Sequence, residues 1–429
     1  ITYNRFPANV GLRYSSFDGY LPEQSGGGGR WYPQTTYPKI QSPFSWSTFA
    51  PRASVVVKLT QDGRNVVKAS YGTYFENLYT WYFSDVINPN VLSTSGLATY
   101  RWTGDLNRNG VVDSGEYDPN PLRVFVPAKN SVDPNLKDPR TDEITLAYQR
   151  EVAANLGFSV SWIQRWYTDN WADVNIGIPT SAYIPQTFVD PGPDNFTNTS
   201  DDRTIALYSV APAYVGKDAF RRQTVPGTTR YKGLEFSVTR RMSNNWQLMG
   251  SYVWSRLDGA LTIGTRQVVD PTNPNLALES NTLGRGSSDQ PHAFKLLGTY
   301  LAPYGINVGI NWQMLQGLPR DREFRRTLSQ GTVTVRAEPR GTYRRETLKL
   351  FSLRANKDFR LRGRSRISGF AELHNALNSN AGQAYFTLTQ AWTSQAELDA
   401  ANRGSTAYFG RVSDILPPRV WKFGFKVDF

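Results

Sequence analysis

The chain contains no cysteine and only two histidines among its 429 residues. The absence of cysteine excludes a disulfide-stabilised scaffold and any metal cluster held by cysteine. The sequence also has no run of about eighteen consecutive apolar residues, which excludes a transmembrane helix. A mean hydropathy of -0.48 would ordinarily indicate a soluble protein. A membrane β-barrel is polar on average as well, however, because only every second residue of its strands meets lipid.

Aromatic residues and positive charges are both abundant. Phe, Trp and Tyr make up 13% of the chain, and aromatic girdles at the two membrane interfaces would explain this excess. The formal net charge of +12 invites comparison with nucleic-acid-binding proteins. Here the basic residues are scattered along alternating segments, so we expect no nucleic-acid partner. A basic barrel mouth or lumen that faces lipopolysaccharide phosphates or an anionic solute fits better.

A period-two alternation of apolar and polar residues recurs along the chain. Between Ile306 and Met314, every even-numbered residue is apolar and every odd-numbered residue is Asn, Gly or Gln. The same alternation occurs at 144–148, 156–162 and 246–254. Such a pattern predicts strands with one apolar face.

The connections between these segments distinguish a membrane barrel from a soluble β-sandwich, whose strands alternate in the same way. Long polar segments rich in Pro, Gly, Asn and Asp alternate with short turns, which lie at Gln61–Asn65, Ala153–Asn155, Ser243–Asn245, Pro303–Gly305 and Arg362–Arg364. Outer-membrane barrels combine short periplasmic turns with long outside loops in this order. We therefore predict an all-β fold, a transmembrane antiparallel up-and-down β-barrel, with residues 77–140 and 169–229 as long extracellular loops.

The pattern predicts about twelve strands, each near or above the roughly ten residues needed to cross a membrane. Their expected spans are 8–17, 51–60, 66–76, 141–152, 156–168, 230–241, 246–257, 292–301, 306–317, 346–360, 366–378 and 418–429. Because the first short turn follows the second strand, we expect the first strand to run outward and the last to run inward. The last strand alternates apolar residues with Lys422, Gly424, Lys426 and Asp428 and stops on an aromatic residue.

A terminal aromatic residue that closes such an alternation resembles the signal by which the barrel-assembly machinery recognises its substrates. The plainer alternative is one more amphipathic strand. The residues of the predicted signal are Trp421, Phe423, Phe425, Val427 and Phe429.

Several segments resemble the C-terminal barrel of TonB-dependent receptors of the Oar-like group. They are NVGLRY at 9–14, VKASYG at 67–72, YKGLEF at 231–236 and the end of the chain from Leu416 to Phe429. Each motif is short, and their order and spacing over essentially the whole chain carry the resemblance.

The resemblance implies a 22-stranded barrel filled by an N-terminal plug, and a box near the N-terminus that contacts TonB. The sequence shows neither, and it lacks the small regulatory-like β-domain that many members carry. We therefore expect residues 1–429 to be a partial sequence that holds the last twelve of the 22 strands. A barrel that closes with twelve strands remains the alternative.

One segment of the sequence has oxygen-bearing residues at the spacing of a metal-binding loop. Residues 105–116 match the twelve-residue calcium loop D-x-[DN]-x-[DN]-G-x5-E, in which Gly110 permits the sharp turn and Glu116 can bind through both oxygens. The predicted Ca²⁺ ligands are Asp105, Asn107, Asn109, the carbonyl of Val111, Asp113 and Glu116. An Asx-rich surface turn is the alternative interpretation.

A second candidate site is a basic stretch in a predicted outside loop. Contact with lipopolysaccharide phosphates is plausible there, as is ordinary solvation, for Arg320, Arg322, Arg325 and Arg326. No motif for nucleophilic catalysis or for phosphate cradling occurs, so we expect no enzyme.

The predicted function is transport across the outer membrane of a Gram-negative bacterium. The resemblance implies ligand capture by the long loops and import driven by TonB, which would act through the N-terminal region. Outer-membrane lipid, lipopolysaccharide and the barrel-assembly machinery are the other expected partners. A cell-surface structural or interaction barrel and a passive porin are the rival interpretations.

Overall fold

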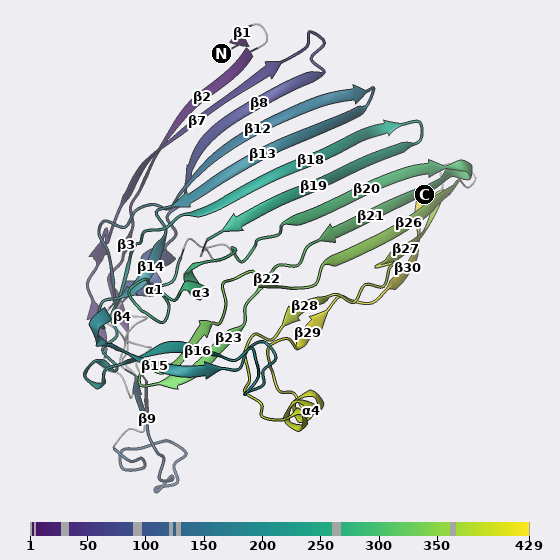
Figure 1. Ribbon diagram of the computed structural model, residues 1–429. Helices are drawn as coiled ribbons and strands as arrows, with labels where there is room; N and C mark the ends of the chain where they lie inside the picture. Colours follow the sequence, from purple (N-terminus) through teal and green to yellow (C-terminus); the bar gives the residue numbers. More distant parts are fainter. Residues whose placement is uncertain are drawn as a thin grey trace.

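The computed structural model describes residues 2–3, 6–26, 34–88, 97–119, 123–125, 130–259, 267–360 and 366–428. Its main element is one curved antiparallel sheet of 13 strands, in which each strand pairs with the next long strand along the chain (Figure 1). None of the helices within these ranges is long and apolar enough to cross a membrane. The all-β antiparallel fold that the alternation predicts is confirmed.

All twelve predicted strands are present, and the two-residue strand β1 (Thr2–Tyr3) adds a thirteenth at the edge beside the first of them. The long strands are β2 (Phe6–Phe17), β7 (Trp46–Lys58), β8 (Asn65–Phe75), β12 (Arg140–Ala153), β13 (Leu156–Thr168), β18 (Thr229–Ser243), β19 (Trp246–Asp258), β20 (His292–Ala302), β21 (Ile306–Leu315), β26 (Leu348–Arg360), β27 (Arg366–His374) and β30 (Val420–Asp428). The largest difference is at β7, which begins at Trp46 because residues 46–51 pair with the end of β2 although their sequence does not alternate.

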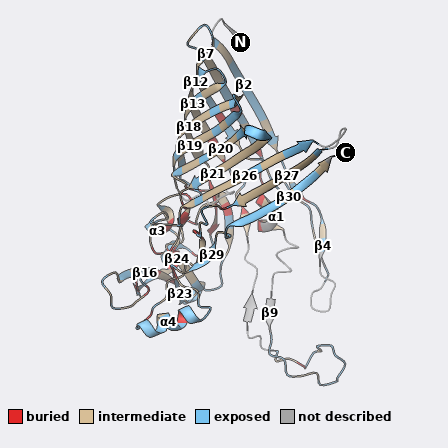
Figure 2. Cartoon of the chain, turned by 90° about the vertical axis from the view of Figure 1, so that its right-hand side faces the viewer, coloured by how far each residue is buried: buried red, intermediate tan, exposed pale blue. Residues whose placement is uncertain are grey.

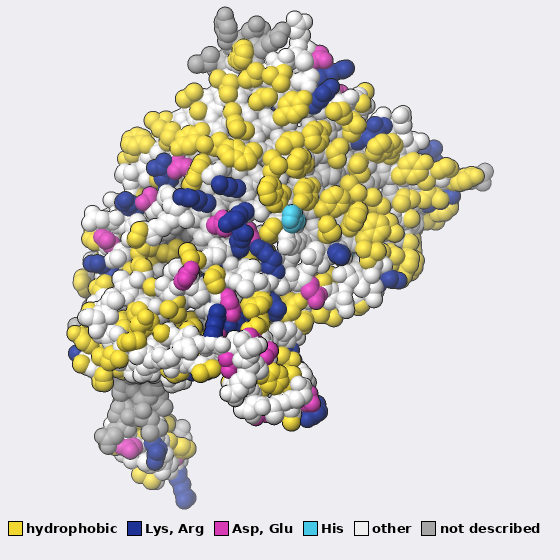
Figure 3. Space-filling view, in the orientation of Figure 1, with side chains coloured by type: hydrophobic (Ala, Val, Ile, Leu, Met, Phe, Trp, Pro, Cys, Tyr) yellow, Lys and Arg dark blue, Asp and Glu magenta, His cyan; other side chains and the backbone are white. Residues whose placement is uncertain are grey.

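The register brings the apolar positions of all twelve strands onto one face. Leu146 lies opposite Ala69 on one neighbouring strand and opposite Trp162 on the other. Ile310 similarly lies between Gly298 and Leu353. Because side chains alternate between the two faces of a sheet, the polar residues of the same strands share the opposite face. One continuous apolar surface results, and Figure 3 shows it as a hydrophobic band across the strands.

Short turns join the strands at one end of the sheet, as predicted. Asn155, Asn244, Asn245 and Tyr304 have positive φ angles of 64°, 50°, 67° and 64° at three of these turns. Asn adopts this left-handed conformation more readily than most residues, which explains its use in tight turns. The predicted turn at Arg362–Arg364 lies outside the described residues.

The long connections gather at the opposite end of the sheet (Figure 1). They contain the strands β3 (Tyr20–Leu21), β4 (Gln24–Gly26), β5 (Thr35–Tyr37), β6 (Ile40–Gln41), β9 (Leu97–Thr99), β10 (Arg123–Phe125), β11 (Ser131–Val132), β14 (Trp171–Asn175), β15 (Tyr183–Asp190), β16 (Arg203–Val210), β17 (Phe220–Thr224), β22 (Pro319–Arg320), β23 (Glu323–Leu328), β24 (Gly331–Arg336), β25 (Tyr343–Arg344), β28 (Gly382–Tyr385) and β29 (Val412–Ile415). Their helices are α1 (Trp81–Ile87), α3 (Glu279–Thr282) and α4 (Gln395–Arg403).

The buried residues of the protein gather in these connections. Figure 2 shows that they lie mainly at the loop end, while most strand residues are exposed or half-buried. A soluble sandwich would bury the apolar face of its sheet, whereas here Leu12 is 67% exposed and Phe425 is 79% exposed. The exposed apolar face is therefore the surface that meets lipid.

Candidate functional site

The long connections pack into one structured body, which we call the loop assembly: residues 18–45, 76–88, 130–139, 169–228, 267–291, 316–347 and 375–419. Four hydrophobic clusters and two buried arginines hold it together. The assembly is the candidate functional site because it lies at the mouth of the sheet, next to the polar inner face.

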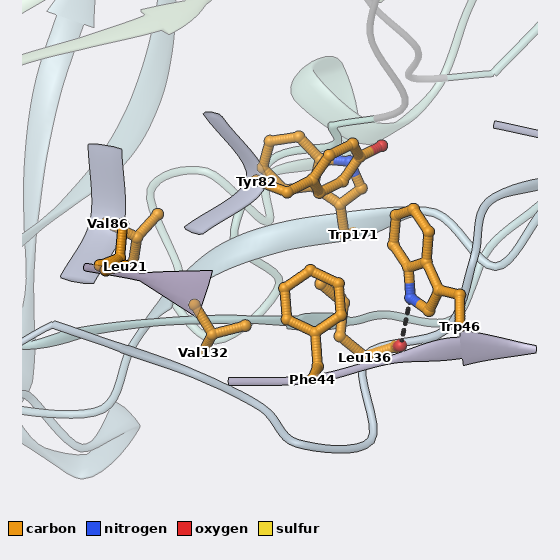
Figure 4. Packing of buried hydrophobic residues seen from close by; sticks show 8 residues of the cluster. All are labelled: Leu21, Phe44, Trp46, Tyr82, Val86, Val132, Leu136 and Trp171. Atoms are coloured by element: carbon orange, nitrogen blue, oxygen red, sulfur yellow. Dashed lines mark hydrogen bonds between the residues drawn. The ribbon is translucent and has the colours of Figure 1, made fainter. Parts of the chain in front are cut away.

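The first cluster joins segments that are far apart in the sequence (Figure 4). Its members are Leu21, Phe44, Trp46, Tyr82, Val86, Val132, Leu136 and Trp171. The indole N–H of Trp46 donates to the carbonyl oxygen of Leu136 at 2.7 Å, and the rings of Trp46 and Tyr82 are 4.9 Å apart. Burial of these aromatic rings fixes α1 and β14 against the start of β7.

Arg222 on β17 lies beside this cluster with its side chain only 4% exposed. Its guanidinium donates to both carboxylate oxygens of Asp173 on β14 and to the carbonyl oxygens of Trp81 and Tyr82. The same group stacks over the Trp171 ring at 4.3 Å from the ring centre. Arg222 thus joins β14 to α1 through hydrogen bonds that would be hard to form with any other side chain.

Arg322 holds together a second part of the assembly. Its guanidinium donates to Asp190 Oδ1 at 2.6 Å and Oδ2 at 2.7 Å, and its Nε donates to both oxygens of Glu338 at 3.0 Å. Arg203 donates to the same two carboxylates, at 3.0 Å each. Burial by itself would raise the pKa of Asp190, but the hydrogen bonds and charges of Arg322 and Arg203 outweigh it and hold that pKa below its ordinary value.

The four arginines of the predicted anion site therefore do not act together. The side chain of Arg322 is fully buried and neutralised, so it does not reach a phosphate outside the protein, and the prediction is corrected there. Arg320 lies among three aromatic rings, with Tyr385 and Phe409 centred 4.5 and 4.8 Å from its guanidinium. The guanidinium group of Arg326 lies 4.1 Å from the centre of the Phe324 ring, and Arg325 is exposed. For these three arginines, lipopolysaccharide contact stays a prediction.

The predicted calcium loop forms a compact turn beyond β9. Gly110 has a φ of 69°, and its N–H donates to Asp105 Oδ2 at 2.9 Å. Glu116 is 3% exposed and accepts the N–H groups of Leu106 and Asp113. Within the described ranges, no group of three or more acidic, histidine or cysteine side chains is arranged to hold a metal ion. Amide and carbonyl oxygens form half of the predicted ligand set, and calcium binding stays a prediction.

The predicted barrel-assembly signal lies on β30, which pairs with β27. Trp421, Phe423 and Phe425 lie on the lipid-facing side and are 58%, 71% and 79% exposed. Val427 follows on the same face, while Phe429 lies outside the described residues. Nothing in the fold tests recognition by the assembly machinery, so the signal also stays a prediction.

The polar inner face of the sheet carries ion pairs. Glu143 on β12 pairs with its register partner Arg165 on β13, and Arg354 on β26 pairs with Glu372 on β27. His374 is 3.3 Å from Glu372. Such a surface suits a water-filled passage and would be costly against lipid.

Sequence reasoning missed the residues that organise the loop assembly, including Asp173, Asp190, Arg222 and Glu338. Each stands in an irregular polar segment without periodicity, so no local pattern marked it. The pairing of Asp190 with Arg322 spans 132 positions of the chain.

A known protein family matches most of the chain. Residues 2–317 match the family described as "Outer membrane beta barrel domain". No relative is found among curated protein sequences.

Similar solved structures include the ferric-catecholate import receptor Fiu of E. coli K12, with 13% identity and a TM-score of 0.45, over 99% of this chain and 42% of that one. The outer membrane transporter YddB of E. coli has 10% identity and a TM-score of 0.48, over 100% of this chain and 52% of that one. The ferripyoverdine receptor of the outer membrane of Pseudomonas aeruginosa has 12% identity and a TM-score of 0.43, over 92% of this chain and 34% of that one. The chain thus spans between about a third and a half of the length of these structures.

Proposed function

The chain belongs to the outer membrane beta-barrel domain family and lies in the outer membrane, and from this premise we propose that it is part of a TonB-dependent receptor. In this proposal the loop assembly captures a ligand from outside and the polar inner face guides it inward. Import would be driven by TonB, which would act through a plug and an N-terminal box of the whole protein.

The observation that carries the proposal is the preorganised loop assembly beside a polar inner face. Arg222 and Arg322 hold loops from distant parts of the chain in one arrangement, with both guanidinium groups buried and paired. A rigid surface loses little entropy when it binds a ligand, which favours selective capture over simple filtration. The sequence resemblance to the Oar-like barrels supports the TonB-dependent step.

Two measurements on the protein purified from outer membranes test the proposal. The first is the conductance of the protein in a planar lipid bilayer, and the second is its binding to the purified periplasmic domain of TonB. A receptor with a plug should conduct little and should bind TonB. Steady open conductance without TonB binding would instead establish a passive porin. A closed channel that does not bind TonB would establish the surface-interaction barrel.

For the predicted metal site, we propose that residues 105–116 bind calcium as a clip that orders the loop between β8 and β12. The spacing of the oxygen-bearing residues and the left-handed Gly110 support this proposal. Asp105, Asp113 and Glu116 would supply the carboxylates. An extracellular site of this kind binds weakly, with a dissociation constant on the order of 0.1–1 mM.

A further inference from the structure

The lipid-facing side of β18 and β19 changes from apolar to basic toward the loop end. Leu234 and Trp254 are register partners on this face, and the next partners on the same face are Lys232 and Arg256. Arg230 and Asp258 follow. Figure 3 shows Lys and Arg side chains gathered beneath the hydrophobic band, over the loop-side ends of these strands.

Two loop arginines complete the cluster. Arg285 donates to Asp258 Oδ1 at 2.9 Å, and its backbone N–H donates to the carbonyl oxygen of Arg340 at 2.8 Å. A hollow of about 670 Å³ opens beside them. Its charged lining residues are Arg230, Arg256, Arg285, Arg340 and Asp258. One carboxylate and four arginines line this hollow, and one of the four, Arg340, forms an ion pair with Asp321 at 3.5 Å and is only 10% exposed.

Within the described part of the chain, Asp258 and Asp321 offset only part of the positive charge of the cluster, and Asp321 pairs with Arg340. Asp258 is shared between Arg256 and Arg285, at 2.5 and 2.9 Å. No described acidic side chain forms an ion pair with Arg230 or Lys232, and both are exposed. Like charges directly opposite each other on neighbouring strands, as in Lys232 and Arg256, are destabilising unless an anion lies between them.

The height of the cluster on the barrel indicates which anion fits. Trp254 is 57% exposed on the lipid-facing side, and exposed Trp residues mark the level of the membrane interface. Arg256 is two residues farther along the strand, which is about 7 Å nearer the loop end. This is the level of the lipid head groups. Outer-membrane barrels have their long loops outside, so these head groups belong to the outer leaflet.

We propose that Arg230, Lys232, Arg256 and Arg285 form a binding site for the phosphate groups of an outer-leaflet glycolipid, lipopolysaccharide. The arginine forks donate paired hydrogen bonds to phosphate oxygens, and Lys232 adds a compact positive charge. Trp254 and Leu234 contact the upper part of the acyl chains. The site is separate from the loop arginines 320–326, and it requires only the outer-membrane location of the barrel, not import by TonB.

Native mass spectrometry of the detergent-purified full chain tests this site, with lipid A and dephosphorylated lipid A as probes. The wild-type protein should bind the phosphorylated lipid at least tenfold more tightly than the dephosphorylated one. The double variant Lys232→Gln/Arg256→Gln should lose about 25-fold in affinity for lipid A, since each basic residue near a charged lipid surface contributes about fivefold. Arg256→Lys with Lys232 intact should keep most of the binding.

Arg150→Gln is the matched control, because Arg150 is exposed on the same face near the turn end. It should leave lipid A binding unchanged, and the heat-dependent gel shift should confirm that every variant is folded. Equal binding of lipid A by the double variant and the wild type would overturn the proposal. So would equal binding of the two lipids, or displacement of lipid A by about 10 mM inorganic phosphate, which would mark a site for free anions.

Discussion

Arg322 and Asp190 form a two-pronged ion pair in the loop assembly, with both guanidinium nitrogens within 2.7 Å of the carboxylate oxygens and both side chains completely buried. Glu338 and Arg203 complete the network. Arg322 and Asp190 are buried, and Arg203 reaches them from the surface; this makes the arrangement of β15, β16, β23 and β24 specific, because a shift would leave Arg322 or Asp190 buried without its partner.

Replacing Arg322 should loosen the loop assembly and spare the sheet. Arg322→Ala leaves Asp190 and Glu338 with only the partly exposed Arg203 as a shared cation, and the loss of one partner of a buried pair costs up to about 3–5 kcal/mol. Hydrogen exchange should rise in β15 and β23, while the heat-dependent gel shift of the barrel stays normal. Arg325→Ala, on the exposed side of the same hairpin, should change neither measurement.

Acid should loosen the same region. The pKa of Asp190 is lower in the folded protein than its ordinary value of about 3.9, so its contribution to stability is fully present above that value. The contribution should be lost as the pH falls further, through the folded-state pKa. Hydrogen exchange of β15 at pH 6 and pH 3, corrected for intrinsic rates, should show the loss. If Asp190→Asn retains the full pH dependence, another group is responsible.

Neighbouring residues of β21 should respond oppositely to a charge. Ile310 lies on the lipid-facing side and Asn311 on the inner side. Ile310→Arg should destabilise the folded barrel by about 2–4 kcal/mol if it lies near the midplane, whereas Asn311→Arg should be tolerated. Urea unfolding in lipid vesicles measures both variants. Equal destabilisation by the two would contradict the assignment of the faces.

Calcium should protect the loop that contains residues 105–116. We expect about 1 mM calcium to slow protease cleavage between residues 100 and 119 of the wild-type protein. Asp105→Ala/Glu116→Ala should be cleaved equally fast with and without calcium. Magnesium at the same concentration serves as the ion control. If calcium does not change the rate at which the wild-type loop is cleaved, the proposed calcium site is wrong.

The predicted assembly signal can be tested by the amount of folded barrel in the outer membrane. Phe429→Ser should reduce that amount severalfold, because Phe429 is the last aromatic residue of the predicted signal and the expected recognition point. Phe359→Ser serves as the control, since Phe359 is an exposed aromatic residue on the lipid-facing side of β26. An equal reduction by both variants would indicate that folding depends on apolar residues anywhere on the lipid-facing surface, and it would contradict a specific signal at Phe429.

The strands were predictable because their signal is local. Alternation between faces repeats every two residues, so Ile306–Met314 by itself reveals which side of β21 is apolar. The short turns are equally local, since Asn155 and Asn245 stand where the chain needs left-handed conformations. These two patterns determine the sheet, its order and its lipid-facing side without any knowledge of distant residues.

The loop assembly was decided only by the tertiary structure. Arg322 looks like any solvated arginine in its segment, and its burial depends on Asp190 and Glu338 reaching the same point from other loops. The basic cluster at Lys232 and Arg256 likewise depends on the register that sets β18 against β19 and on the loops that bring Arg285 and Arg340 beside them. A strand's pattern arises from backbone geometry, which each segment carries by itself. The partner of a loop charge is set by packing between segments, and no single segment contains that information.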